Sequence, residues 1–223
     1  MIVLNDVSIE QGNKLILSNV SLRVQKGEFI YLVGETGSGK SSFLKSLYAE
    51  VKIKTGEIFI DKLKVSAIKE KKIPELRRNL GIVFQDFQLL NDRNIFQNLE
   101  FVLNSTGWKN KDKINNRIKE SLEAVHLKDV ENKMPYELSG GEQQRAVIAR
   151  SILNKPKLII ADEPTGNLDP DKSEKIINLL KEINKLGTTI LIATHDYEII
   201  KKFPSRIIKC QDLSLQDINI ENL

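Results

Sequence analysis

The sequence predicts an α/β fold in which helices cover a mostly parallel sheet, and three observations support this. Short apolar runs typical of strands alternate with helical patterns along most of the chain. A glycine-rich loop directly follows one of these runs. Strand signals then vanish over residues 89–153, which indicates a helical insertion. We therefore expect one domain, with a core of residues 1–88 and 154–223 and a helical subdomain of about 89–153.

Composition narrows the class of protein. The chain has 223 residues, enough to bury a sizeable core, and its apolar runs reach only about five residues against the ~20 of a membrane helix. Cys210 is the only cysteine, and the N-terminus lacks a secretory pattern, so we expect a cytoplasmic protein. The net charge of +4 suits an anionic partner, but it is more often only a solvated surface and identifies no partner.

Seven short segments have the apolar pattern of strands. A helix is expected over residues 169–186, because Asp169 can cap it, Pro170 suits its first turn and Gly187 ends it. The charged residues 109–113 are expected to form an exposed loop. The predicted strands are residues 20–24, 29–33, 56–60, 81–84, 158–161, 188–193 and 206–209.

The loop after residues 29–33 predicts a phosphate site, because GETGSGKS fits the pattern G-x-x-x-x-G-K-[ST]. Its glycines let backbone N–H groups turn inward, and a helix that begins near Lys40 adds its positive end. Lys40 is expected to reach the β and γ phosphates and Ser41 to bind Mg²⁺. A chance glycine loop is the alternative, but the preceding strand argues against it. The loop residues are Gly34, Glu35, Thr36, Gly37, Ser38, Gly39, Lys40, Ser41 and Ser42.

Two carboxylates end the apolar run LIIADE at residues 158–163. Ligands of open α/β sheets bind beyond the carboxyl ends of the strands, so Asp162 is expected to hold Mg²⁺ through water and Glu163 to polarise an attacking water. A surface turn would explain the pair taken alone, but a phosphate loop in the same chain makes that explanation weaker. His195 follows the next strand and is expected to contact the γ-phosphate.

The segment LSGGEQQR, residues 138–145, predicts a helix start that could bind a second anion. Ser139 and Glu142 have the spacing of a capping box, while Gly140 and Gly141 leave backbone N–H groups open. A helix that is merely well capped explains the same residues, and the residues alone leave both interpretations open.

Taken together, these motifs resemble the ATP-binding subunits of the ABC superfamily. The resemblance rests on GETGSGKSS, Gln85, LSGGEQQR, LIIADEP, GNLD and the histidine after the last strand, and it covers about residues 3–209. It implies a RecA-like P-loop NTPase core with an N-terminal antiparallel β portion and an inserted α-helical subdomain. It also implies ATP hydrolysis with Mg²⁺ in a head-to-tail homodimer that holds two ATP, where residues 139–141 of one subunit close over the ATP on the partner's Lys40 loop.

The same resemblance assigns further roles. It implies that Gln85 senses Mg²⁺ and the attacking water and acts as a hinge to the helical insertion, and that Asp169 crosses the dimer interface besides capping its helix. One feature departs from the family, in which an aromatic residue near the first strand stacks on adenine. Here residues 8–12 read SIEQG, so we expect a weaker preference for adenine and competition by GTP.

The resemblance also implies a membrane partner. In the family the insertion after Gln85 is where membrane subunits dock, so part of the set Phe87, Leu89, Leu90 and Phe96 is expected to contact a helix of an integral membrane protein, and the rest to be core. This would place the chain at the cytoplasmic face of the inner membrane, as a peripheral protein.

Finer similarities favour one group within the family. The run LRR at residues 76–78, then FQD, LL and Asp92-Arg93, is similar to the members that act in cell division. Lipoprotein-releasing and macrolide-type exporters share LSGGEQQR and GNLD and are the main alternative. Soluble ABC proteins of ribosomes or DNA are a third class, but they carry two ATPase domains or a long coiled-coil insertion, so no direct nucleic-acid binding is expected.

Overall fold

The computed structural model describes residues 1–223, which form two sheets with helices around them. The first sheet is antiparallel and has the order β2-β1-β4-β5. It contains β1 (Ile2–Gln11), β2 (Lys14–Val24), β4 (Ile53–Ile60) and the short β5 (Leu63–Lys64).

The second sheet has the order β10-β9-β3-β8-β7-β6 and is parallel except for β10, which runs against β9 at one edge. The strand before the glycine loop, β3, therefore lies in the interior of the sheet between β9 and β8. The strands are β3 (Phe29–Val33), β6 (Leu80–Val83), β7 (Leu158–Asp162), β8 (Thr189–Ala193), β9 (Arg206–Gln211) and β10 (Ser214–Ile218).

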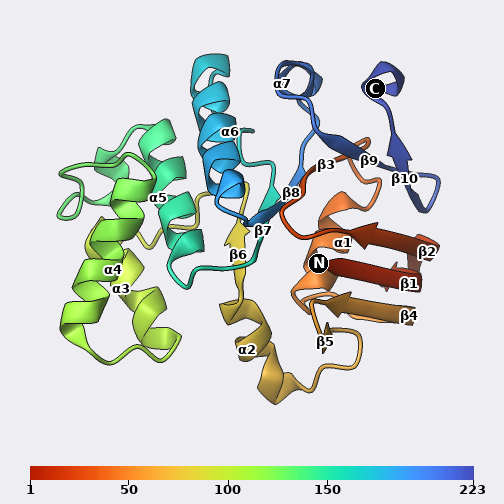
Figure 1. Ribbon diagram of the computed structural model, residues 1–223, viewed down its shortest axis with the longest axis horizontal. Helices are drawn as coiled ribbons and strands as arrows, with labels where there is room; N and C mark the ends of the chain where they lie inside the picture. Colours follow the sequence, from red (N-terminus) through yellow and green to blue (C-terminus); the bar gives the residue numbers. More distant parts are fainter.

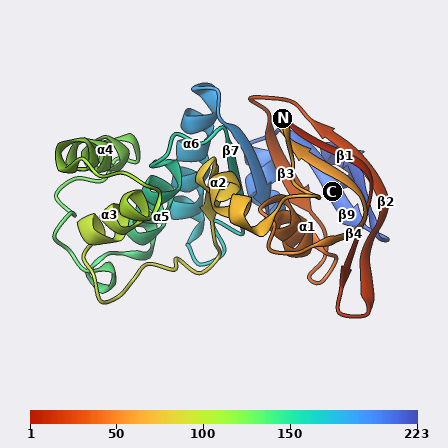
Figure 2. The same cartoon turned by 90° about the horizontal axis from the view of Figure 1, so that it is seen from below.

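Seven α-helices and three short 3₁₀ turns complete the chain. No strand lies between β6 and β7, and the helices α3, α4 and α5 of this segment gather at the end of the molecule opposite the antiparallel sheet (Figures 1 and 2). None of the helices has the length and apolar character needed to cross a membrane. They are α1 (Lys40–Leu47), α2 (Ile73–Arg78), α3 (Ile95–Ser105), α4 (Lys111–Ala124), α5 (Gly140–Ile152), α6 (Pro170–Lys185) and α7 (Tyr197–Lys202), with η1 (Glu70–Lys72), η2 (Pro135–Glu137) and η3 (Ile220–Asn222).

The sequence of β3 explains its central position. All five of its residues are buried, as expected of a parallel strand with helices or a second sheet on each face. Phe29, Tyr31 and Val33 point into a core of 32 residues shared with α5 and α6. Ile30 and Leu32 point into a second core of 27 residues, built with α1 and the antiparallel sheet. The phosphate loop thus starts from a strand that is fixed on both faces.

Most predicted elements are confirmed. β3 has the predicted bounds, and β7, β8 and β9 differ from the predictions by at most two residues. α6 begins after Asp169, whose side chain accepts the Lys172 N–H at 3.0 Å, as the predicted cap requires. β2 and β4 start earlier than predicted, at Lys14 and Ile53.

Two predictions differ from the structure. Residues 109–113 are not a loop throughout, because Asn110 accepts the Lys113 N–H at 2.9 Å and so caps α4, whose first turn begins at Lys111. β1 was not among the predicted strands. It pairs with both β2 and β4 through interrupted register, and Asp6 within it has a φ of 48°.

Candidate nucleotide-binding site

The glycine loop joins β3 to α1 and can be built only with glycine at two positions. Gly34 has φ 149°, and a Cβ there would lie 2.4 Å from the carbonyl oxygen of Cys210 in β9. Gly39 has φ 111°, and a Cβ there would lie 2.5 Å from Cγ2 of Ile16 in β2. Both contacts are far too close for a real side chain. Strand β9 near the C-terminus and strand β2 near the N-terminus therefore restrict the conformation of the loop.

Two polar groups of the loop can donate hydrogen bonds to a phosphate. The Lys40 ammonium is buried and donates to the carbonyl oxygens of Gly34 at 2.7 Å and Glu35 at 3.0 Å. The Ser38 hydroxyl is buried and has no hydrogen-bond partner. An unpaired buried hydroxyl costs about 1–3 kcal/mol, so an oxygen-rich ligand in the loop would satisfy it. The geometry fits a bound polyphosphate.

Asp162 and Ser41 form the part of the site that suits a divalent cation. Asp162 ends β7, and its pKa is raised mainly by burial and also by the neighbouring Glu163, while the Ser41 hydroxyl and Lys40 oppose the shift. A hydroxyl and a carboxylate beside a phosphate loop are the oxygen ligands that Mg²⁺ prefers. The chain has no cluster of three His, Cys, Asp or Glu residues for a metal. Mg²⁺ would thus need phosphate oxygens and water as additional ligands.

Glu163 and His195 meet at the ends of the neighbouring strands β7 and β8. Nδ1 of His195 lies 2.8 Å from Oε1 of Glu163. The Glu163 side chain is only 11% exposed, whereas that of His195 is 70% exposed and faces solvent. Glu163 has φ 47°, and its N–H donates to the Ala193 carbonyl at 2.9 Å. A non-glycine residue in this region costs about 1–3 kcal/mol, and such strain is concentrated at functional sites.

Gln85 follows β6 and lies at the same edge of the sheet, because β6 pairs in parallel with β7. Its carbonyl accepts the side-chain amide of Asn167 at 3.0 Å, and its own amide nitrogen would be 3.8 Å from a Cβ on Gly166. The Gln85 side chain is therefore beside the loop that follows Glu163. The predicted site residues Lys40, Ser41, Gln85, Asp162, Glu163 and His195 all come from the carboxyl ends of β3, β6, β7 and β8 or the segments that follow them.

Residues 139–141, the second predicted anion site, lie at the start of α5. The Glu142 carboxylate accepts the Ser139 N–H at 2.9 Å and the Ser139 hydroxyl at 2.6 Å, and these bonds lower the pKa of Glu142. The nearest neighbours of Gly140 are Leu168, Phe87 and Asn167, and that of Gly141 is Lys172. None belongs to the loop of residues 34–42. Within one chain, Gly140 and Gly141 therefore pack against segments other than the predicted phosphate loop.

Two residues that sequence reasoning missed hold the segment after Gln85. The guanidinium of Arg150 in α5 donates to the carbonyl oxygens of Phe87 and Gln88, and burial lowers the pKa of Arg150. Asn98 in α3 is only 2% exposed and bonds to the backbone of Leu90, Arg93 and Asn94. The available sequence signal was a polar residue on the buried face of a helix, since Asn98 lies between Ile95 and Leu99.

The residues predicted to receive a partner are divided between core and surface. Phe87, Leu89 and Phe96 are partly buried and pack against the larger core. Leu90 is 37% exposed. Phe101 in the following helix α3 is 47% exposed, and the Arg93 guanidinium stacks 4.8 Å from its ring centre. Leu90 and Phe101 are therefore the apolar side chains that this region offers to solvent.

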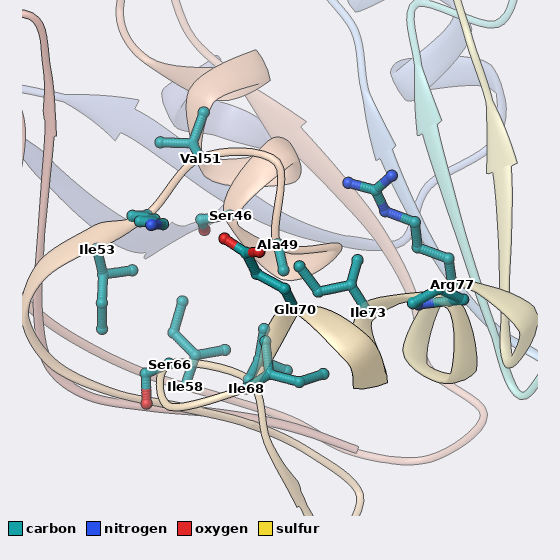
Figure 3. Close-up of a pocket in the computed structure, with 13 residues that line it drawn as sticks. Ser46, Ala49, Val51, Ile53, Ile58, Ser66, Ile68, Glu70, Ile73 and Arg77 are labelled. Carbon is teal, nitrogen blue, oxygen red and sulfur yellow. The ribbon is translucent and has the colours of Figure 1, made fainter.

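A cavity of about 590 Å³ lies elsewhere, between α1, β4 and α2. Apolar side chains that include Ile53, Ile58, Ile68 and Ile73 surround it, and Arg77 lies at one side (Figure 3). None of its lining residues belongs to the phosphate loop or to the carboxylate pair. The size of a cavity thus does not locate the nucleotide site, because residues 34–38 of the phosphate loop line a smaller cavity of about 430 Å³.

Comparison with known proteins identifies the family. The family model described as ABC transporter matches residues 17–166. The chain is 48% identical to the cell division ATP-binding protein FtsE of Streptococcus pneumoniae D39, over 88% of this chain and 85% of that protein. It is 47% identical to FtsE of Bacillus subtilis, over 88% and 86%. It is 39% identical to FtsE of Escherichia coli K12, over 90% of both chains.

Solved structures agree with this result. A dimeric ATP-binding cassette in a post-hydrolysis state, bound to ADP and phosphate, matches with a TM-score of 0.86, 33% identity and 99% coverage of both chains. The cbiO1 protein of Clostridium perfringens, part of an ABC transporter complex, matches with a TM-score of 0.90 and 28% identity, covering 99% of this chain and 89% of that chain. The predicted fold class is confirmed. The sequence match, the two sheets and the arrangement of the phosphate loop show that this chain belongs to the ATP-binding cassette family of ABC transporter ATPases.

Proposed function

We propose that this protein is the ATP-hydrolysing subunit of an FtsE-type membrane complex, which drives an integral membrane partner like FtsX to regulate cell-wall hydrolysis during cell division. The observation that carries the proposal is the similarity to FtsE proteins, 39–48% identity over 86–90% of this chain. The proposal has a physical basis in the structure. The predicted triphosphate site lies at one surface, and the segment after Gln85 connects this site to a second surface.

The phosphate loop would bind ATP through its backbone N–H groups and Lys40. The Lys40 ammonium would leave the Gly34 and Glu35 carbonyls for phosphate oxygens, a change that replaces neutral acceptors with charged ones. The Ser38 hydroxyl would gain the partner that it lacks. Each change favours the bound form, so binding is driven by the phosphates.

Ser41, Asp162 and Gln85 would hold Mg²⁺ together with phosphate oxygens and water. The ion, when bound, neutralises the charge that develops on the β and γ phosphates. It would also relieve the unfavourable burial of the Asp162 carboxylate, because a cation favours the ionised form. The residues present fit this role, since a hydroxyl and a carboxylate already lie side by side.

Glu163 would accept the proton of the attacking water, and His195 would contact the γ-phosphate. The 2.8 Å contact holds the His195 imidazole beside the Glu163 carboxylate, and the exposed imidazole can turn toward a phosphate. The hydrogen bond from the Glu163 N–H to the Ala193 carbonyl fixes the backbone position from which the Glu163 side chain extends. Removal of the carboxylate should therefore stop hydrolysis without loss of the nucleotide.

A head-to-tail homodimer would complete the site. Residues 139–141 lie away from the phosphate loop of their own chain, and their open N–H groups at the start of α5 suit an anion. A second copy would bring this helix start to the γ-phosphate, and Asp169 would lie at the same interface. Hydrolysis would then remove the group that bridges the two subunits and let them open.

The segment after Gln85 would carry this change to the membrane partner. Gln85 lies beside the loop that follows Glu163. The residues after Gln85 are hydrogen-bonded to Arg150 of α5 and to Asn98 of α3. Leu90 and Phe101 are the exposed apolar side chains of this region. We expect them to contact a helix of the partner at the cytoplasmic face of the inner membrane.

Co-purification from membranes tests the proposal. The full chain, added with ATP to detergent-solubilised membranes of its own organism, should capture an integral protein with four membrane helices and the division-associated character of FtsX. Capture of an exporter subunit instead would favour a lipoprotein-releasing or macrolide-type system. Salt-sensitive retention of nucleic acid without any membrane protein would overturn the proposal in favour of a soluble ABC protein.

A matched pair of variants locates the contact. Leu90→Asp places a charge on a side chain that is 37% exposed and should abolish capture while ATPase activity of the isolated subunit is kept. Leu186→Asp makes the same change at the far end of α6, where the side chain is 87% exposed, and should capture the partner normally. Equal capture by both variants would exclude Leu90 from the contact.

A further inference from the structure

The end of the β1–β2 hairpin lies against the phosphate loop. The Ser42 hydroxyl donates to Oε1 of Gln11 at 2.8 Å, and Ile16 packs over Gly39. A nucleotide whose phosphates occupy the loop would therefore extend its sugar and base along this hairpin, beyond Ser42. The hairpin end consists of Glu10, Gln11, Gly12, Asn13 and Lys14, and none of these residues offers an aromatic ring.

Few aromatic rings elsewhere in the chain are free to contact a base. Only Phe101, Tyr136 and Tyr197 are exposed, at 47%, 73% and 38%. The ring of Phe101 in α3 is covered by the guanidinium of Arg93. Tyr197 borders one cavity with Glu163 and His195 and a second with residues 34–38 of the loop, and neither cavity includes Ser42 or the hairpin end. Tyr136 is the most exposed ring.

Tyr136 is held out on a rigid turn. It is the middle residue of η2 (Pro135–Glu137), between buried Pro135 and exposed Glu137, and buried Leu138 follows the turn. The Met134 N–H donates to the Glu137 carboxylate at 2.7 Å, and the Leu138 N–H donates to the Pro135 carbonyl at 3.1 Å. The turn therefore presents the ring with little loss of conformational freedom on binding, which is an advantage for a contact residue.

Tyr136 precedes Ser139 by three residues. Three residues span at most about 10 Å, and the tyrosine side chain adds several more, which is comparable to the distance from a γ-phosphate to the base of an extended nucleotide. In the proposed head-to-tail dimer, Ser139 of one copy reaches the phosphates held by the other. Since Tyr136 lies within this reach of Ser139, the sugar and base of that nucleotide fall within the range of its ring.

We propose that Tyr136 of one subunit stacks on the purine base of the nucleotide bound by the Lys40 loop of the second copy, an inference that rests on the proposed head-to-tail dimer. The base contact then forms only when the dimer closes. A single subunit binds its nucleotide through the phosphates, and closure adds the stacking. Because stacking uses the face of a base and not its edge, ATP and GTP both gain from it.

The test uses the full chain, Mg²⁺ and a triphosphate of 2-aminopurine riboside, whose fluorescence is quenched by stacking. Dimer formation is followed by sedimentation in the Glu163→Gln background, which we expect to retain the nucleotide. We expect quenching on dimer formation. Tyr136→Ala should remove this quenching and weaken the nucleotide-dependent dimer about 10-fold, within the 5- to 150-fold range of base stacking.

Two further variants separate stacking from other effects. Tyr136→Phe keeps the ring and should restore both quenching and dimer affinity. Phe101→Ala removes an exposed ring from α3 and should change neither. If Tyr136→Ala forms a normal dimer with full quenching, the assignment of Tyr136 is wrong and the dimer stands. If the parent protein forms no dimer with any nucleotide, the head-to-tail dimer fails, and the assignment of Tyr136 fails with it.

Discussion

Replacing Asn98 by alanine tests whether one buried side chain holds the segment between Gln85 and α3. Oδ1 of Asn98 accepts the Leu90 N–H at 2.7 Å, and Nδ2 lies 3.0 Å from the carbonyl oxygens of Leu90, Arg93 and Asn94. The amide has two hydrogens, so it satisfies two of these carbonyls at once. At about 1 kcal/mol for each of three bonds, the loss is about 3 kcal/mol. The better helix propensity of alanine returns about 0.5 kcal/mol.

The measurement is urea unfolding of the nucleotide-free chain followed by circular dichroism. We expect Asn98→Ala to lose about 2–3 kcal/mol. Asn104→Ala, an exposed asparagine near the end of the same helix, should stay within about 0.5 kcal/mol of the parent. Asn98→Asp should be no more stable than Asn98→Ala, because a carboxylate would face three carbonyl oxygens. A loss below about 0.5 kcal/mol for Asn98→Ala would refute the view that this side chain fixes the segment.

Three further predictions concern the nucleotide site. Glu163→Gln should bind ATP, lose turnover and accumulate as a dimer, and near-normal phosphate release would exclude Glu163 as the base. Lys40→Ala should lose at least about tenfold in ATP affinity by calorimetry, since it removes a charged donor to phosphate, and unchanged affinity would contradict the phosphate-loop assignment. Without Mg²⁺, Asp162→Asn should raise Tm by a few degrees at pH 7.5, because the raised pKa of Asp162 makes its ionised form unfavourable in the fold. That gain should vanish toward pH 4, where the carboxyl is protonated, and a gain independent of pH would contradict this cause.

The sequence predicted the buried parallel strands and the residues at their ends. β3, β7 and β8 are continuous apolar runs because both of their faces are covered, and such runs are visible without any knowledge of their neighbours. The phosphate loop and the carboxylate pair follow these strands directly. Parallel pairing then brings their ends to one edge of the sheet, so the chemistry could be located before the fold was known.

Features that depend on distant contacts were missed. β1 has an irregular pattern, with Asn5 and Asp6 both exposed between buried Leu4 and Val7, because a bulge interrupts its pairing with β2. This breaks the period of two that identifies a strand. Arg150 bonds to a carbonyl 62 residues earlier in the chain, and no local pattern indicates which carbonyl a helical arginine will reach.

The interior position of β3 also sets when the protein can become active during its synthesis. The two strands that flank it, β8 and β9, start at residues 189 and 206, so a ribosome has made most of the chain before β3 can pair on either side. The carbonyl of Cys210 that packs against Gly34 comes later still. We expect nucleotide binding to appear only on nearly complete chains. Products of premature termination would expose the apolar strand Phe29–Val33 to proteases and chaperones.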